Sequence, residues 1–218
     1  MFIGHLAVGF AAKRAAPKTT LGLLMAAPLL LDLIWPLLVL AGLERVEIDP
    51  GNTAFTPLAF VHYPITHSLV GATAWALAAA AGYWAVTRYG RGALVIGVAV
   101  LSHWFMDAIA HRPDLPLYPG SAARAGLGLW NSVGGTIIVE SITFTAGVWI
   151  YAATTRAIDR VGQFAFWSFV ALAAAIYGAA ASGGPPPPNP QAVAIVGLMS
   201  WLFPLWAAWF DRHRKPQY

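Results

Sequence analysis

The sequence predicts an all-α integral membrane protein, a bundle of six transmembrane helices preceded by a short N-terminal half-helix. Composition is the first reason, because 58% of the 218 residues are hydrophobic and only 10% are charged, which is too apolar for a soluble domain of this size. The second reason is that six mostly apolar runs follow one another. Each has roughly the 20 residues that the hydrocarbon core of a bilayer requires.

The spans and their connections follow in order along the chain. After the first span, Asp49–Asn52 is a turn signal, and the later loop Arg112–Gly128 is rich in Pro and Gly. The four consecutive prolines within Ser182–Pro190 exclude a helix and predict a short, stiff, extended connector before the last span. The predicted spans are Leu21–Leu43, His67–Arg88, Gly92–Ala110, Leu129–Thr155, Val161–Ala181 and Gln191–Phe210.

The N-terminal segment Phe2–Ala12 is apolar but too short to cross a membrane. It lacks the charged region that precedes the core of a signal peptide, so we expect no cleavage. An ordinary surface helix would leave His5 in the cytoplasm. A half-helix inserted from that side would instead raise His5 about 12 Å above Lys13, and Gly4 and Gly9 would allow it to pack closely against another helix.

We expect one domain with no internal repeat. Residues 1–156 hold the half-helix, four spans and the polar residues, and residues 157–218 add two apolar spans joined by the Pro-rich connector. Because these last two spans carry almost no ionisable side chain, we expect them to pack against the bundle or to bind a protein partner. The candidate docking face comprises Trp167, Phe169, Trp201, Phe203 and Trp206.

The positive charges predict the orientation, since Lys and Arg concentrate on the cytoplasmic side of membrane proteins. One side takes Lys13, Arg14, Lys18, Arg88, Arg91, Arg156, Arg160, Arg212, Arg214 and Lys215, and the other takes Arg45, Arg112 and Arg124. Both termini are therefore expected in the cytoplasm. The net charge of +4 reflects this orientation rather than a nucleic-acid surface. The chain has no cysteine, which excludes disulfides and thiolate metal sites.

Ionisable residues within apolar spans are costly, so each is a functional candidate. The candidates are Asp32, His67, His103, Asp107 and Glu140, with His111 at the outer end of the third span. A rise of about 1.5 Å per residue places His103 roughly 18 Å above Arg91 and Asp107 about 24 Å above it. Asp32 and His67 reach the same layer, so we expect the groups to converge. Glu140 fits a helix–helix hydrogen bond equally well.

Imidazole and carboxylate together suit a divalent metal ion, with zinc the default where no redox chemistry is needed. Zinc with an open position lowers the pKa of bound water and supplies a nucleophile. The expected general base is Glu140, or whichever of Asp32 and Asp107 is not a ligand. Arg112, next to His111, is a candidate to hold an anionic headgroup, and a pair with Asp114 is the alternative. No HExxH or GxSxG motif occurs.

Several of these residues stand in patterns that resemble a known family. The patterns are Gly4-His5, an Asp in the first span, THSL at Thr66–Leu69 and SHWFMD at Ser102–Asp107, followed by a Pro-rich stretch. Together they resemble bacterial inner-membrane proteins described as membrane-bound metal-dependent hydrolases, a domain-of-unknown-function family. FIGHLAVGFAAK, DPGNTAFTPL, HRPDLPLYPG and LGLWNS further resemble a compact subgroup of hypothetical membrane proteins.

The resemblance covers Met1 to Tyr151 and implies a polar set of His5, Asp32, His67, His103 and Asp107. One departure is that the family commonly carries Pro-Asp-x-Asp where this sequence has only Asp32, in LLLDLIWP. The missing carboxylate weakens the case for two metal ions and for catalysis.

The leading hypothesis is therefore a metal-dependent hydrolase that acts on a membrane lipid or another amphipathic substrate in the outer half of the bilayer. The alternative is a non-enzymatic protein, either an accessory subunit of a membrane complex or a path for ions or protons. A path would need polar groups continuing toward Arg91, but Gly92–Leu101 is apolar. The pattern favours a one-sided site.

Overall fold

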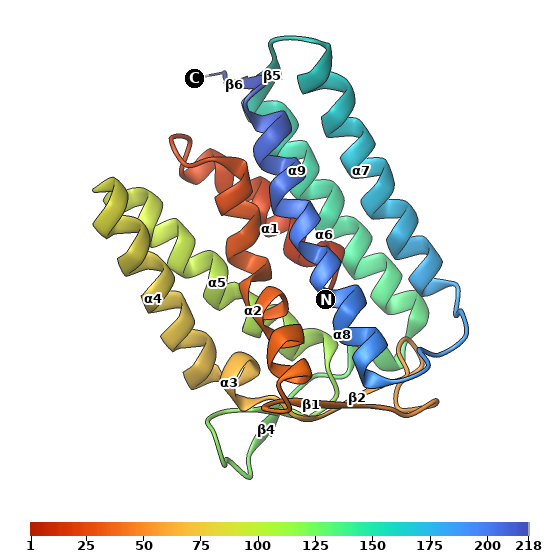
Figure 1. The fold of residues 1–218 in the computed structure, drawn as a ribbon. Helices are drawn as coiled ribbons and strands as arrows, with labels where there is room; N and C mark the ends of the chain where they lie inside the picture. The colour runs from red at the N-terminus through yellow and green to blue at the C-terminus, as the bar shows by residue number, and fades with distance from the viewer. Residues whose placement is uncertain (218) are drawn as a thin grey trace.

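Long helices run side by side in the computed structural model, which describes residues 1–217, and short strand pairs lie at the two ends of the bundle (Figure 1). The helices are α1 (Ile3–Ala15), α2 (Leu21–Leu40), α3 (Pro64–His67), α4 (Leu69–Thr87), α5 (Gly90–Ala110), η1 (Leu129–Asn131), α6 (Val133–Thr154), α7 (Arg160–Ala181), α8 (Pro190–Leu198), η2 (Met199–Trp201) and α9 (Leu202–Asp211). The strands are β1 (Arg45–Ile48), β2 (Leu58–His62), β3 (Leu115–Pro116), β4 (Arg124–Ala125), β5 (Thr155–Ala157) and β6 (Arg214–Pro216).

Within residues 1–217, six helices are long and apolar enough to cross a membrane, so the prediction of a multi-pass membrane protein is confirmed at that level. They are α2, α4, α5, α6, α7 and the continuous run α8–η2–α9, which spans Pro190–Asp211. Capping side chains define where several of these helices begin, which hydropathy alone does not determine. Ser132 accepts a hydrogen bond from Gly135 N and starts α6, and Ser68 accepts one from Gly71 N and starts α4.

Helix α1 lies inside the bundle, packed against α2, α5 and α6, and Leu6 and Phe10 are fully buried. Its 13 residues extend about 20 Å. Close approach depends on glycine, because a Cβ at Gly147 of α6 would lie only 2.5 Å from the carbonyl oxygen of Ala7. Gly9 packs on α2 in the same way, as the sequence suggested, since its Cβ would lie 2.9 Å from the Cα of Met25.

The end of α1 distant from His5 is fixed by a buried ion pair. Lys13 Nζ lies 2.7 Å from Asp211 Oδ2, although the sequence placed Lys13 in a surface cluster of positive charge. The same oxygen accepts a hydrogen bond from Leu21 N at 2.9 Å, and Oδ1 accepts one from the Tyr151 hydroxyl at 2.9 Å. This single carboxylate therefore links α1, α2, α6 and α9.

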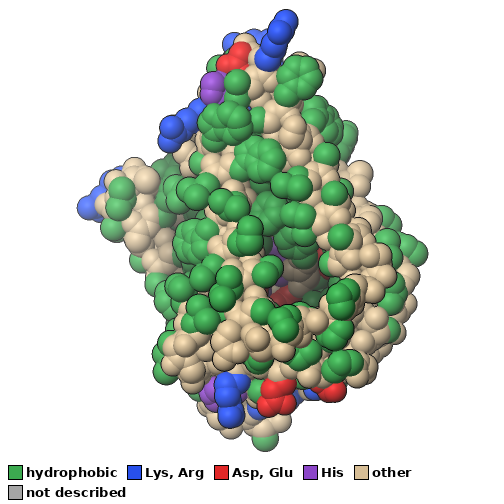
Figure 2. All heavy atoms as spheres, turned by 45° about the vertical axis from the view of Figure 1, so that its right-hand side comes forward, with side chains coloured by type: hydrophobic (Ala, Val, Ile, Leu, Met, Phe, Trp, Pro, Cys, Tyr) green, Lys and Arg blue, Asp and Glu red, His purple; other side chains and the backbone are tan. Residues whose placement is uncertain are grey.

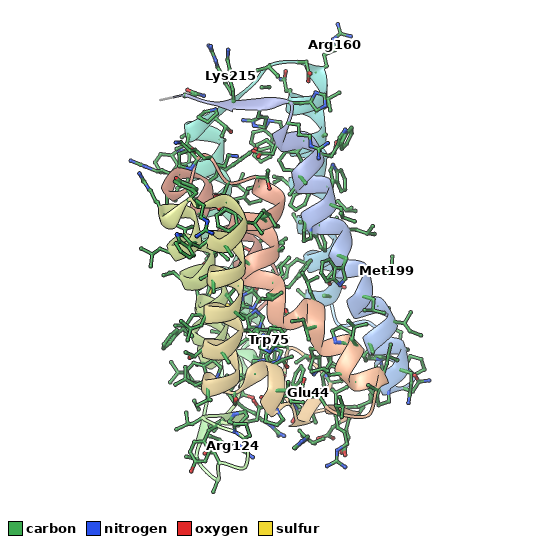
Figure 3. The ribbon with its side chains drawn as sticks, turned by 60° about the vertical axis from the view of Figure 1, so that its left-hand side comes forward. Glu44, Trp75, Arg124, Arg160, Met199 and Lys215 are labelled. Atoms are coloured by element: carbon green, nitrogen blue, oxygen red, sulfur yellow. The ribbon has the colours of Figure 1, made fainter. Side chains whose placement is uncertain are left out.

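The loop with the turn signal and the loop rich in Pro and Gly both contain strand pairs. Strands β1 and β2 form an antiparallel hairpin around the predicted turn, where Asn52 N donates to the Asp49 carbonyl at 3.0 Å. Strands β3 and β4 pair at the same end of the bundle (Figure 1). Figure 3 shows Glu44 and Arg124 at this end and Arg160 and Lys215 at the opposite end, where β5 pairs with β6.

The centre of the bundle is aromatic. Phe10 contacts the rings of Phe166 and Phe169 at centroid separations of 5.8 and 5.6 Å, and all three side chains are fully buried. Phe169 also packs against Phe203 and Trp206, so part of the proposed docking face is internal. Outward-facing side chains such as Trp149 and Leu205 are more than half exposed, as expected for surface that faces lipid.

Candidate metal centre

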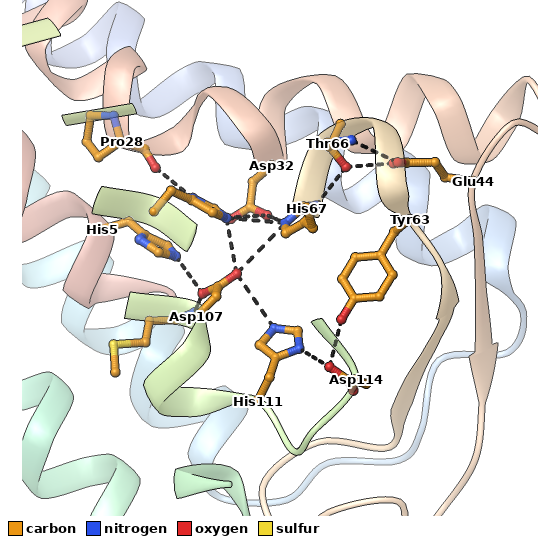
Figure 4. Close-up of polar contacts among 12 residues, drawn as sticks. His5, Pro28, Asp32, Glu44, Tyr63, Thr66, His67, Asp107, His111 and Asp114 are labelled. Carbon is orange, nitrogen blue, oxygen red and sulfur yellow. Dashed lines mark hydrogen bonds and ion pairs between the residues drawn. The ribbon is translucent and has the colours of Figure 1, made fainter. Parts of the chain in front are cut away.

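The five residues of the predicted polar set meet in one cluster (Figure 4). The cluster takes His5 from α1, Asp32 from α2, His67 from α3, and His103 and Asp107 from α5. Four of the side chains are almost completely buried, whereas the Asp32 side chain is 38% exposed. The depth estimate from helical rise was therefore sufficient to predict that side chains from separate helices meet.

The hydrogen-bond partner of His103 fixes its tautomer. His103 Nδ1 lies 2.8 Å from the carbonyl oxygen of Pro28, and a carbonyl can only accept a hydrogen bond. Nδ1 of a neutral imidazole therefore carries the proton, and Nε2 presents its lone pair. That nitrogen lies 3.1 Å from Asp107 Oδ2, one helical turn further along α5.

His67 is oriented by a longer relay of hydrogen bonds. The Thr66 hydroxyl donates to Glu44 Oε2 at 2.6 Å, so its oxygen is left to accept from His67 Nδ1 at 2.7 Å. Glu44 is itself buried and also accepts hydrogen bonds from Ile65 N and Thr66 N at 2.7 and 2.9 Å. His67 Nε2 therefore also presents a lone pair to the cluster.

When both imidazoles are neutral, their lone pairs face each other, because His67 Nε2 and His103 Nε2 are 3.2 Å apart. Asp32 Oδ1 lies 3.4 and 3.7 Å from these nitrogens, and Asp107 Oδ2 lies 3.8 and 3.1 Å from them. Four ligands at about 2.0–2.1 Å from a tetrahedral zinc ion would be separated from one another by about 3.3 Å. The ligand atoms of Asp32, His67 and His103 form one group within 4.8 Å, and this spacing fits a single divalent cation.

His5 approaches Asp107 from the other side. His5 Nε2 lies 3.0 Å from Asp107 Oδ1, and its ring stacks on His103 with a centroid separation of 4.0 Å. The α-amino group of Met1 contacts the same oxygen at 2.5 Å. His5, His103 and Asp107 form a second group whose ligand atoms lie within 4.8 Å of one another. His5 thus either holds a cation directly or orients the Asp107 carboxylate that does.

His111 extends the cluster toward the hairpin end of the bundle. Its Nε2 lies 3.6 Å from Asp107 Oδ2, and its Nδ1 lies 3.0 Å from Asp114 Oδ1. The Tyr63 hydroxyl donates to the same Asp114 oxygen at 2.6 Å. Burial raises the pKa of the Tyr63 phenol, and the Asp114 carboxylate raises it further, so the phenol stays protonated as a donor.

Arg112 pairs with Asp114, the alternative to binding an anionic headgroup. Its Nε lies 3.6 Å from Asp114 Oδ2, its side chain is 41% exposed, and it is not among the residues that line the cavity beside the cluster. Asp114 contacts Tyr63 and His111 as well as Arg112.

Glu140 lies on α6 at the edge of the same site. Its Oε2 accepts hydrogen bonds from Phe2 N at 2.9 Å and Gly4 N at 3.2 Å, so the carboxylate stabilises the N-terminus of α1. It also lines a cavity of about 210 Å³ together with Asp32, Asp107 and His111. Both readings of Glu140 from the sequence, a contact between helices and a group facing a reaction site, remain compatible with this position.

Sequence reasoning missed the residues that orient the histidines. Thr66 was visible beside His67 in THSL, and a hydroxyl next to a candidate ligand is a usable signal. Glu44 gave no comparable signal, because it lies in a loop 22 positions before Thr66. The Pro28 carbonyl is a backbone group, so no side-chain pattern could indicate it.

We expect Thr66→Val to weaken binding of a divalent metal ion by about 10- to 100-fold, because His67 loses the acceptor that fixes its tautomer. Thr66→Ser keeps the hydroxyl and should stay near wild type. Competition with a chromophoric chelator measures both dissociation constants. Thr143→Val is the matched control, since the Thr143 hydroxyl donates a hydrogen bond of 2.7 Å to the Val139 carbonyl of its own helix, away from the cluster. Equal affinities for the Val and Ser variants would contradict the relay.

Comparison of the chain with protein-family models, curated proteins and solved structures finds no match. The family resemblance carried by THSL and SHWFMD therefore stays an expectation. What the fold and the site define together is a multi-pass membrane protein with a buried His/Asp cluster able to hold a metal ion.

Proposed function

We propose that this protein is a metal-dependent hydrolase of the bacterial inner membrane that holds one divalent cation, zinc, and acts on a lipid or another amphipathic substrate. The observation that carries the proposal is the opposition of His67 Nε2 and His103 Nε2 at 3.2 Å, with both protons held on the far side of the rings. Neutral imidazoles would then face each other with their lone pairs beside the Asp32 and Asp107 carboxylates, an arrangement that favours a cation between them.

The proposed ligands are Asp32, His67, His103 and Asp107, with His5 against the second oxygen of Asp107. When bound, the cation would supply Lewis-acid chemistry and acidify a coordinated water. The candidates for general base are Asp32, whose carboxylate is the most exposed of the cluster, and Glu140, which lines the adjoining cavity.

The proposed orientation rests on the Lys and Arg residues. Arg160 and Lys215 lie at one end of the bundle, and the sparsely basic hairpins lie at the other (Figure 3). We place the Lys215 end in the cytoplasm, with the C-terminus on that side and the metal cluster nearer the outer face. The α-amino group of Met1 contacts Asp107 in the cluster, so the N-terminus lies within the bundle and not at the cytoplasmic end that the sequence predicted for it. In this arrangement α1 is a half-helix that enters from the cytoplasmic side and carries His5 toward the middle of the membrane.

Ion or proton translocation receives less support. A path from the cluster to the Lys13–Asp211 pair would have to pass Phe10, which lies between His5 and Lys13 on α1 and is enclosed by buried aromatic rings. An accessory role has the exposed rings of Trp201 and Trp209 in its favour, but contact with lipid accounts for them equally well.

Metal analysis of the purified protein tests the proposed function. We expect about one zinc ion per wild-type chain and none in His103→Ala, because His103 belongs to both possible ligand groups. His62→Ala is the matched control, since His62 is exposed on β2 outside the cluster, and it should keep the metal. If neither the wild type nor the control contains stoichiometric metal, the hydrolase proposal is wrong.

A further inference from the structure

The cavity beside the metal cluster opens sideways into the apolar surface. Figure 2 shows a hollow in the green face, between the charged ends, with acidic and histidine side chains visible at its bottom. The cavity beside the cluster has a volume of about 210 Å³, and its lining residues include Asp32, Asp107 and Glu140. Because the surrounding surface is of the kind that faces lipid, a substrate can reach the cluster from within the bilayer.

Aromatic rings form most of the remaining wall, namely Phe2, Trp35, Phe55, Phe60 and Trp130. Trp130 packs on the His111 ring at a centroid separation of 4.3 Å, and Phe60 packs on the same ring at 4.9 Å. The indole N–H groups of Trp35 and Trp130 have no acceptor among residues 1–217. Apart from the α-amino group of Met1, which is paired with Asp107, the wall therefore offers apolar surface and uncharged donors.

The described lining of this cavity includes no Lys or Arg side chain, and the α-amino group of Met1, which also lines it, is already paired with Asp107. Arg112 lies against Asp114, and Arg124 donates to the Ser121 carbonyl and lines a separate outer pocket of about 120 Å³. Recognition of a phosphate group usually relies on such cations. A phosphate here would instead meet the carboxylates of Asp32 and Glu140, at a depth where unpaired charge is costly.

We propose that the substrate is an amphiphile whose reacting group is an uncharged acyl group, a carboxylic ester or amide, and that it enters laterally from the membrane. This inference rests on the proposed function. Hydrolysis would break the acyl C–O or C–N bond, with the hydroxyl of water going to the acyl carbon and its proton to the departing oxygen or nitrogen. The products are a carboxylic acid and an alcohol or amine, and no other reactant is required.

Two probes with the same chain test this substrate class on the zinc-loaded protein in detergent. Dodecanohydroxamic acid is an acyl analogue that is uncharged in neutral solution and loses one proton when it binds zinc, whereas dodecylphosphonic acid carries the charge of a phosphate. Titration calorimetry should show the hydroxamate binding at least about tenfold more tightly, because the phosphonate meets no cationic side chain. Trp130→Leu should weaken hydroxamate binding, whereas Trp149→Leu, which alters an exposed ring outside the cavity, should not.

Equal or tighter binding of the phosphonate overturns the inference, and so does failure of both probes to bind to protein that holds its metal. Either result would contradict the proposed substrate class but not the proposed metal centre. Metal analysis of the same samples separates these cases from failure of the proposed function, because protein that takes up no zinc refutes both together.

Discussion

Zinc added to the metal-free wild-type protein is expected to raise its free energy of unfolding by about 4 kcal/mol when free metal exceeds the dissociation constant 1,000-fold. The reason is that the ion binds only where Asp32, His67, His103 and Asp107 are held together, which requires the folded bundle. Thermal unfolding in detergent, followed by circular dichroism with and without zinc, measures the effect. Addition of a chelator should reverse it.

The double variant His67→Ala/His103→Ala should show no response to zinc, since it removes both opposed nitrogens and breaks both ligand groups. His62→Ala, which removes an exposed imidazole outside the cluster, should respond like the wild type. An unchanged zinc response of the double variant would show that the metal binds elsewhere and would remove the basis of the proposed site.

The cluster could be predicted from the sequence because helices impose a fixed rise and a fixed angle per residue. His103 and Asp107 had to face one way from α5, and the length of each span placed Asp32 and His67 at the same level. His5 required the additional assumption that α1 enters the bundle, and it does meet Asp107. The sequence therefore indicated which side chains meet, but not which atoms face one another.

The groups that orient the ligand side chains come from irregular or distant parts of the chain. Glu44 follows α2 in a turn, and its carboxylate reaches Thr66 only because the β1–β2 hairpin folds back at this end of the bundle. Hairpin pairing depends on contacts between segments that hydropathy does not relate, so the sequence indicated the turn at Asp49–Asn52 but not the paired strands on either side of it. The second polar centre was missed for the same reason, since Lys13 and Asp211 are 198 positions apart.

Lys13→Met should destabilise the protein by about 3–5 kcal/mol, the usual cost of removing one partner of a buried ion pair. The carboxylate of Asp211 would keep its donors, Leu21 N and the Tyr151 hydroxyl, but would lose the ammonium group 2.7 Å away. Thermal unfolding in detergent measures the loss. Arg14→Met is the matched control, because the adjacent Arg14 side chain is exposed, and it should change the free energy of unfolding little.

Adding Asp211→Asn to Lys13→Met distinguishes loss of charge balance from loss of packing. Asparagine keeps one acceptor oxygen for Leu21 N, and its amide N–H can donate to the Tyr151 hydroxyl oxygen in place of the second acceptor. It also removes the buried negative charge, so the double variant should recover part of the lost stability. If the double variant is no more stable than Lys13→Met alone, then the methylene chain of Lys13 and its other contacts fix α1 against α9, and the ion pair contributes little.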